Sequence, residues 1–106
     1  MKRIETIKSQ RMFNDIIKNG KFVKNNYLVI YNKEKEEETI NYGIAISNKV
    51  GNAVTRNKLK RQVRYIIDQH RNLFKNGNNY IIMIRKSCQD IKYNVLHDSL
   101  VSLIEK

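Results

Sequence analysis

The sequence predicts a single α+β domain over residues 1–106, with helices packed against a sheet of about four strands. A chain of 106 residues has room for one modest hydrophobic core. Apolar residues recur every three or four positions in some segments, as in amphipathic helices, and alternate or run continuously in others, as in strands. In chain order these segments give α-β-β-β-α-β-α, and no linker or internal repeat divides them.

The first half of the chain predicts one helix and three strands. Ser9 is a candidate N-cap for a helix with apolar positions 12, 13, 16 and 17, and Asn19-Gly20 predicts a left-handed stop. Strands are predicted at 22–23, 27–31 and 40–47, with Tyr27 and Tyr31 on the same face of the second one. The acidic block 34–38 is predicted to be a hairpin loop between the last two strands.

The second half predicts a long helix at roughly 53–74, a turn at 76–79, a strand at 80–84 and a last helix within about 90–105. The strand is a continuous apolar run, which favours burial on both faces. The strand at 40–47, the long helix and the strand at 80–84 together form a predicted β-α-β unit.

The charge balance points to a polyanionic partner. The net charge is +11 and the isoelectric point is about 9.9, so nucleic acid is the first candidate and a membrane surface the second. No apolar run approaches the ~20 residues of a spanning helix, and no signal peptide is visible. Cys88 is a single cysteine, which favours a reducing, cytoplasmic location without disulfides.

A basic segment at residues 49–64, KVGNAVTRNKLKRQVR, lacks acidic residues. Apolar residues at helical spacing, from Leu59 to Phe74, hold one face of its helix on the core and leave the other face for cations. Asn52 or Thr55 is its candidate N-cap. Such a face is either a phosphate-binding site or merely solvated. The candidate RNA-binding residues are Lys49, Asn52, Arg56, Asn57, Lys58, Lys60, Arg61 and Arg64.

This segment resembles the signature of the bacterial ribonuclease P protein component, with Lys58 at a position where the family has arginine. The resemblance implies a left-handed β-α-β crossover and a subunit of an endoribonuclease that carries no catalytic residue itself. It implies binding to the catalytic RNA and to the 5′ leader of precursor tRNA, assisting removal of that leader. It also implies one protein per RNA, Mg²⁺ required by the RNA–protein complex, and no cofactor or metal held by the chain.

A second candidate site is aromatic. Phe13 and Ile17 lie one turn apart on the first helix, and Tyr27 and Tyr31 share one face of a predicted strand. If that face meets the first helix, the four residues line a groove. Aromatic rings stack on unpaired bases, although plain core is the simpler explanation of such a group. In the family that the chain resembles, a groove of this kind holds the leader, so the four residues are candidate leader contacts.

Other chemically capable residues predict no site. His70 falls on the apolar stripe and is expected to be a core-edge histidine, whereas His97 has no second metal ligand at suitable spacing. Cys88 has no evident base, the glutamates of block 34–38 are expected to be solvated, and Asp68 is expected to form helix ion pairs.

Two other functional classes are left open. A self-sufficient nuclease needs converging carboxylates or a histidine pair, and neither is evident in the sequence. A ribosomal or double-stranded RNA-binding protein without a processing role would also explain the basic helix, but it would not need a stacking surface.

Overall fold

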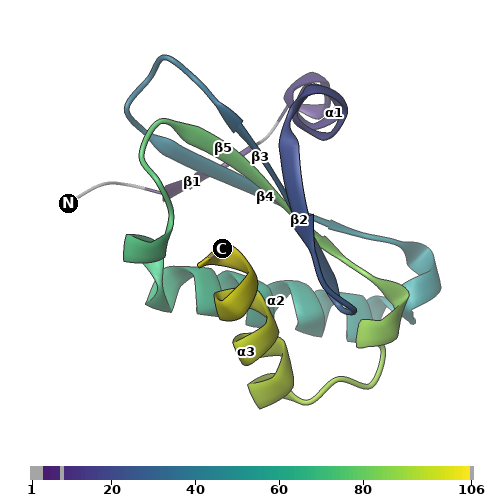
Figure 1. Ribbon diagram of the computed structural model, residues 1–106. Coiled ribbons are helices and arrows are strands. Elements are labelled where there is room, and N and C mark those ends of the chain that lie inside the picture. The colour runs from purple at the N-terminus through teal and green to yellow at the C-terminus, as the bar shows by residue number, and fades with distance from the viewer. Residues whose placement is uncertain (1–3, 8, 106) are drawn as a thin grey trace.

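A mixed five-stranded sheet of order β1-β4-β5-β3-β2 forms the centre of the fold, as the computed structural model shows for residues 4–7 and 9–105 (Figure 1). The elements are β1 (Ile4–Thr6), α1 (Gln10–Asn19), β2 (Lys21–Lys24), β3 (Leu28–Glu34), β4 (Ile40–Ile46), α2 (Ala53–Gln69), β5 (Asn78–Ile84) and α3 (Tyr93–Ile104). The α+β class and the predicted order are confirmed. Strand β1, which has three residues and pairs in parallel with β4, was not predicted.

Strand β5 occupies the middle of the sheet. It runs parallel to β4 and antiparallel to β3, so the acidic block between β3 and β4 does not close a hairpin, and that prediction is wrong. The reason is burial: Tyr80, Ile81, Ile82 and Ile84 are all buried, as the apolar run predicted. A strand that is covered on both faces is most stable inside the sheet, with a neighbouring strand on each side. The strand also begins at Asn78, inside the predicted turn.

The two faces of the sheet carry separate hydrophobic clusters. Figure 1 shows α2 and α3 on one face and α1 on the other. The larger cluster lies under α2 and α3 and includes Leu28, Ile30, Tyr42, Ile82 and Leu96. The smaller cluster lies under α1. It is formed by Ile7, Ile16 and Ile81, with Phe13, Ile17, Tyr31 and Ala45 packed on them and only partly buried.

Helix α2 connects the parallel neighbours β4 and β5, which gives the predicted β-α-β unit. Its left-handed sense stays a prediction from the resemblance. The helix begins after Asn52, whose side chain accepts a hydrogen bond from the backbone N–H of Thr55. It ends at Gln69 rather than near residue 74, and a 3₁₀ turn (Arg71–Leu73) follows.

Helix α1 begins as predicted, with the Ser9 hydroxyl accepting from the backbone N–H of Met12. Its end differs from the prediction, because Gly20 is extended (φ −83°, ψ 171°) rather than left-handed. A Cβ at Gly20 would lie 2.5 Å from the carbonyl oxygen of Ile16 and 2.6 Å from that of Asn32. Glycine is therefore needed here for the close approach of the chain to β3.

Within the residues that the structure describes, no helix is long and apolar enough to cross a bilayer.

Candidate nucleic-acid-binding surfaces

The basic face of α2 is held outward by its buried face. Leu59, Val63, Ile66 and Ile67 are all at most 3% exposed, and they anchor the helix on the larger cluster. The cations of the basic segment are therefore directed away from the core. Lys58, Arg61 and Arg64 are exposed, while Arg56 and Lys60 are half-buried along the edge of the buried face.

These cations do not form a single line. At about 100° per residue, Arg56, Lys60 and Arg64 fall on one flank of α2, and Lys58 points about 120° away from Arg64 around the helix axis. Arg61 lies between the two flanks. The basic face is therefore a broad fan, which fits several phosphates better than one bound anion.

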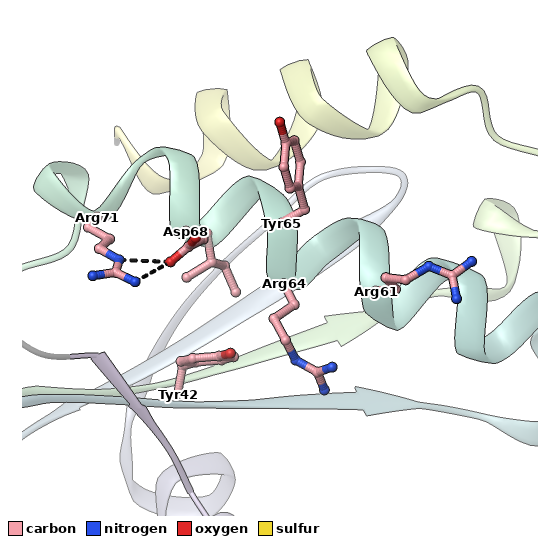
Figure 2. Close-up of a pocket in the computed structure, with 7 residues that line it drawn as sticks. Tyr42, Arg61, Arg64, Tyr65, Asp68 and Arg71 are labelled. Atoms are coloured by element: carbon pink, nitrogen blue, oxygen red, sulfur yellow. Dashed lines mark hydrogen bonds and ion pairs between the residues drawn. The ribbon is translucent and has the colours of Figure 1, made fainter.

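A groove between α2 and the sheet, here called the arginine groove, contains part of this fan (Figure 2). Arg71 donates two hydrogen bonds to the Asp68 carboxylate, one of them 2.9 Å from Nε, so the predicted helix ion pair of Asp68 is confirmed. Arg61 and Arg64 are the other cations of the groove. It is lined by Tyr42, Arg61, Arg64, Tyr65, Ile67, Asp68 and Arg71.

The remaining residues of the basic segment lie in or next to the first turns of α2. Lys49 is exposed in a 3₁₀ turn (Asn48–Val50), and Arg56 donates a hydrogen bond to the Asn48 side chain. The Asn52 oxygen is 2.9 Å from the N–H of Thr55, so capping occupies its acceptor and leaves its NH₂ group for other partners. Exposed Asn57 lies one turn further along the helix. Unpaired N–H groups at a helix start add positive potential to that of the side chains.

The aromatic candidates lie on the opposite face of the sheet. Phe13, Ile17 and Tyr31 all pack on the smaller cluster, so the structure brings these three predicted residues together. We call them the aromatic cluster. All three keep part of their surface exposed, unlike the fully buried Ile81 beneath them.

Tyr27 is not part of the aromatic cluster. It precedes the first residue of β3 and packs against the larger cluster, on the other face from Tyr31. Its backbone is turned by Asn25, whose side-chain oxygen accepts from the N–H groups of Tyr27 and Leu28. The alternation that predicted a shared face therefore does not extend to Tyr27.

Residues that the sequence did not predict extend the surface of the aromatic cluster. Phe22 of β2 is 57% exposed, and its ring centroid is 5.8 Å from that of Tyr31. A separate groove at the ends of β4 and β5 begins at Ala45, which also packs on the smaller cluster. This groove is lined by Ala45, Ile46, Ser47, Met83, Ile84, Arg85 and Lys86. Only the strand pairing, which no local pattern encodes, reveals that Met83 lies beside Ala45.

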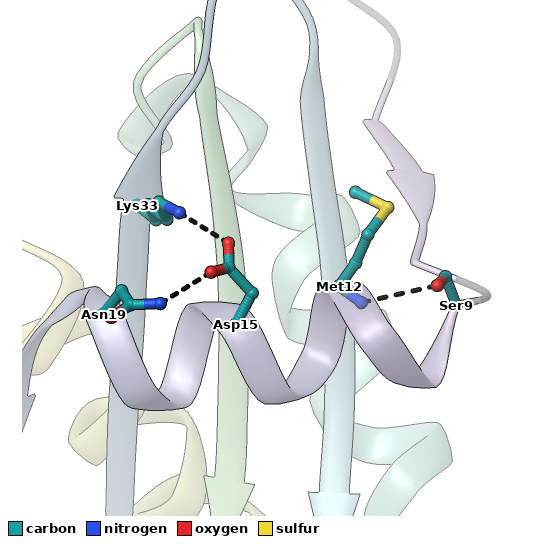
Figure 3. A network of polar contacts seen from close by, with 5 residues as sticks. All are labelled: Ser9, Met12, Asp15, Asn19 and Lys33. Atoms are coloured by element: carbon teal, nitrogen blue, oxygen red, sulfur yellow. Dashed lines mark hydrogen bonds and ion pairs between the residues drawn. The ribbon is translucent and has the colours of Figure 1, made fainter.

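Polar contacts fix α1 over β3 (Figure 3). The Asp15 carboxylate accepts from the Lys33 ammonium group of β3, and from the Asn19 side chain at 2.7 Å. These hydrogen bonds, chiefly that from Lys33, hold the pKa of Asp15 below its usual value. Asp15 therefore stays ionised and paired at neutral pH, and it orients the helix that carries Phe13 and Ile17.

Gly43 makes room for the aromatic cluster. A Cβ at this position of β4 would lie 2.3 Å from the Phe13 ring. We expect Gly43→Ala to displace the ring and to cost about 1 kcal/mol of stability, near the lower end of typical overpacking penalties. Thermal unfolding followed by circular dichroism measures the cost. Unchanged stability together with an unchanged Phe13 environment in NMR spectra would contradict the packing described.

The remaining candidates give no nucleophile. Burial raises the pKa of the Cys88 thiol to about 11, so the thiolate is scarce at neutral pH. The described residues contain no group of three or more His, Cys, Asp or Glu placed to hold a metal. One expectation is overturned: His97 does have a histidine neighbour, because its Nε2 lies 2.9 Å from that of half-buried His70.

Known proteins resemble the whole chain. The profile of the Ribonuclease P family matches residues 1–106. The ribonuclease P protein component of Mycoplasma capricolum is 42% identical, with 100% of this chain and 98% of that protein covered. That of Bacillus cereus (strain AH187) is 33% identical, with coverages of 100% and 93%.

Solved structures agree with this result. The ribonuclease P protein of Staphylococcus aureus superposes with a TM-score of 0.88 at 31% identity, covering 94% of this chain and 92% of that one. The ribonuclease P protein of Thermotoga maritima gives a TM-score of 0.86 at 27% identity, covering 94% of both chains. Sequence and fold together show that this chain belongs to the family of bacterial ribonuclease P protein components.

Proposed function

We propose that this chain is the protein subunit of a ribonuclease P, binding the catalytic RNA and the 5′ leader of precursor tRNA and assisting endonucleolytic removal of the leader. The observation that supports it best is the pairing of two different RNA-compatible surfaces on one small sheet. The fan of cations on α2 suits a phosphate backbone, and the aromatic cluster under α1 suits unpaired bases.

The two surfaces have different chemistry and lie on opposite faces of the sheet. In this proposal the α2 face binds the catalytic RNA, one protein per RNA, and the aromatic cluster holds the leader. Phosphate contacts position an RNA without reading its sequence, and stacking tolerates any base. The chain would thus act on leaders of many sequences.

The cleavage step belongs to the RNA partner in this proposal, together with the Mg²⁺ that the complex requires. The protein contributes by reducing phosphate repulsion and by holding the substrate in register with the catalytic RNA. The cations of the arginine groove and of the first turn of α2 supply the first effect, and the contact of α1 with β3 through Asp15 and Lys33 supports the second. We place the complex in the cytoplasm, where tRNA is made in bacteria.

The alternatives have less support. A double-stranded RNA-binding protein without a processing role does not account for half-exposed aromatic residues grouped under α1. A self-sufficient nuclease gains the pair His70 and His97, but their Nε2 atoms contact one another, so the two rings are not held apart as an acid and a base on either side of a substrate.

Reconstituted cleavage tests the proposal. The purified protein is added to a bacterial ribonuclease P RNA and precursor tRNA at an Mg²⁺ concentration too low for the RNA alone. We expect the protein to restore cleavage at the leader junction, since it offsets the phosphate repulsion that high Mg²⁺ otherwise screens. No restoration would reject the proposal, and cleavage by the protein without any RNA would favour the nuclease class.

A further inference from the structure

We propose that His70 and His97 form a binding site for a divalent transition metal such as Zn²⁺, which links α2 to α3. The pocket at this site shares Tyr65 with the arginine groove, but neither histidine belongs to the basic segment or to the aromatic cluster, and the site does not depend on the proposed function. His70 is the C-cap of α2, and His97 lies in the middle of α3. Their Nε2 atoms are 2.9 Å apart.

The hydrogen bonds of this pair indicate which tautomer each neutral ring adopts. The Nδ1 atom of His97 lies 3.0 Å from a carboxylate oxygen of Asp98, which can only accept, so Nδ1 carries the hydrogen. In the neutral ring, Nε2 of His97 is then an acceptor. The facing Nε2 of His70 must therefore be the donor in the metal-free protein.

This arrangement matches a pattern found around metal-bound histidines. A ligating imidazole commonly donates its other ring N–H to a carboxylate, which fixes the ring and makes the ligating nitrogen more basic. His97 and Asp98 already form that pair. His70 supplies the second nitrogen once its own hydrogen moves to Nδ1, a change of tautomer that leaves the ring neutral.

The spacing requires only a small movement. Two nitrogen ligands at about 2.0–2.1 Å from a tetrahedral Zn²⁺ lie about 3.3 Å apart, close to the 2.9 Å of the hydrogen-bonded pair. Both histidines are half-buried at the border of an open pocket, so a metal can enter and water can fill the remaining positions. The amide side chains of Gln69 and Asn94 line the same pocket, which also includes Tyr65 and Tyr93.

The position of the pair favours a cation as well. The carbonyl groups at the C-terminal end of a helix produce negative potential, and His70 lies at that end of α2. Imidazole nitrogens are suitable ligands for Zn²⁺, Ni²⁺, Co²⁺ and Cu²⁺. A bound ion would connect the helix that carries the cations to the C-terminal helix of the chain.

Calorimetric titration of the metal-free full-length protein with Zn²⁺ tests the site, with Co²⁺ absorption reporting coordination by nitrogen. We expect one equivalent to bind and to raise the melting temperature. His70→Gln and His97→Gln should each weaken binding at least tenfold, and Asp98→Asn about 10- to 100-fold through the lost orientation of His97. Circular dichroism establishes that each variant is folded before titration.

Glu38→Gln is the matched control, because it removes a carboxylate from the exposed acidic block without touching the histidines. It should bind Zn²⁺ as the wild type does. Binding that is lost in Glu38→Gln but kept in both histidine variants would place the metal elsewhere and overturn the proposal. Absence of Zn²⁺, Ni²⁺ and Co²⁺ binding at millimolar concentration would also overturn it.

Discussion

Phe13→Ala and Tyr31→Ala should each weaken binding of precursor tRNA to the reconstituted ribonucleoprotein, while binding of mature tRNA stays unchanged. Both side chains pack under α1 with part of their surface exposed, where an unpaired base of the leader can stack on them. Loss of one stacked base costs about 1–3 kcal/mol, which is about a 5- to 150-fold change in affinity. Fluorescence titration with both tRNAs measures the two dissociation constants.

Stability must be separated from binding in this experiment. Both residues pack on the smaller cluster, so each variant is first melted, because truncating a packed aromatic can cost about 3–5 kcal/mol. Tyr27→Ala is the matched control: it is also a half-buried tyrosine, but it packs on the larger cluster. It should lower stability and leave the ratio of the two affinities unchanged. If Tyr31→Ala is folded and binds both tRNAs as the wild type does, the leader lies elsewhere.

Lys60→Ala combined with Arg64→Ala should flatten the salt dependence of binding to the catalytic RNA. The two residues lie on the same flank of α2, where Arg64 is exposed and Lys60 is half-buried at the edge of the buried face. Each phosphate neutralised contributes about −0.7 to the slope of log K against log salt for single strands and about −0.9 for duplexes. The double variant should therefore lose about 1.4–1.8 units of slope, measured by filter binding over a series of salt concentrations.

Lys92→Ala provides the comparison for this effect. Lys92 is an exposed lysine at the start of α3, outside the basic segment. Its removal changes the net charge of the protein without removing a proposed phosphate contact, so the slope should stay close to that of the wild type. An equal effect of Lys92→Ala would mean that only the overall charge attracts RNA. An unchanged slope in the double variant would mean that the α2 face is merely solvated.

The parts of the fold that the sequence predicted are those where one local pattern decides the structure. The period of Leu59, Val63 and Ile66 specifies which face of α2 is buried, so the outward direction of its cations follows directly. The continuous apolar run of β5 likewise predicted burial on both faces. The grouping of Phe13, Ile17 and Tyr31 required in addition that their strand face meet the first helix, which alternation in β3 does not decide and which the resemblance implied.

The parts of the fold that the sequence did not predict depend on contacts between segments that are distant along the chain. The acidic block looks like a hairpin loop locally, but the pairing of β3 with β5 is decided by burial over the whole sheet. Strand β1 is too short to show a period. The contact between His70 and His97, 27 residues apart, arises from the packing of α2 on α3, and neither histidine has a local signal for it.

The ratio of the affinities for precursor and mature tRNA, with and without this protein on the catalytic RNA, tests the account most directly. Precursor and mature tRNA differ in the leader, and the aromatic cluster is proposed to contact only the leader. We predict that adding the protein raises the affinity for precursor tRNA and leaves that for mature tRNA nearly unchanged at constant salt. An equal gain in affinity for both tRNAs would contradict the account, because it would mean that the protein contributes only positive charge and no contact with the leader.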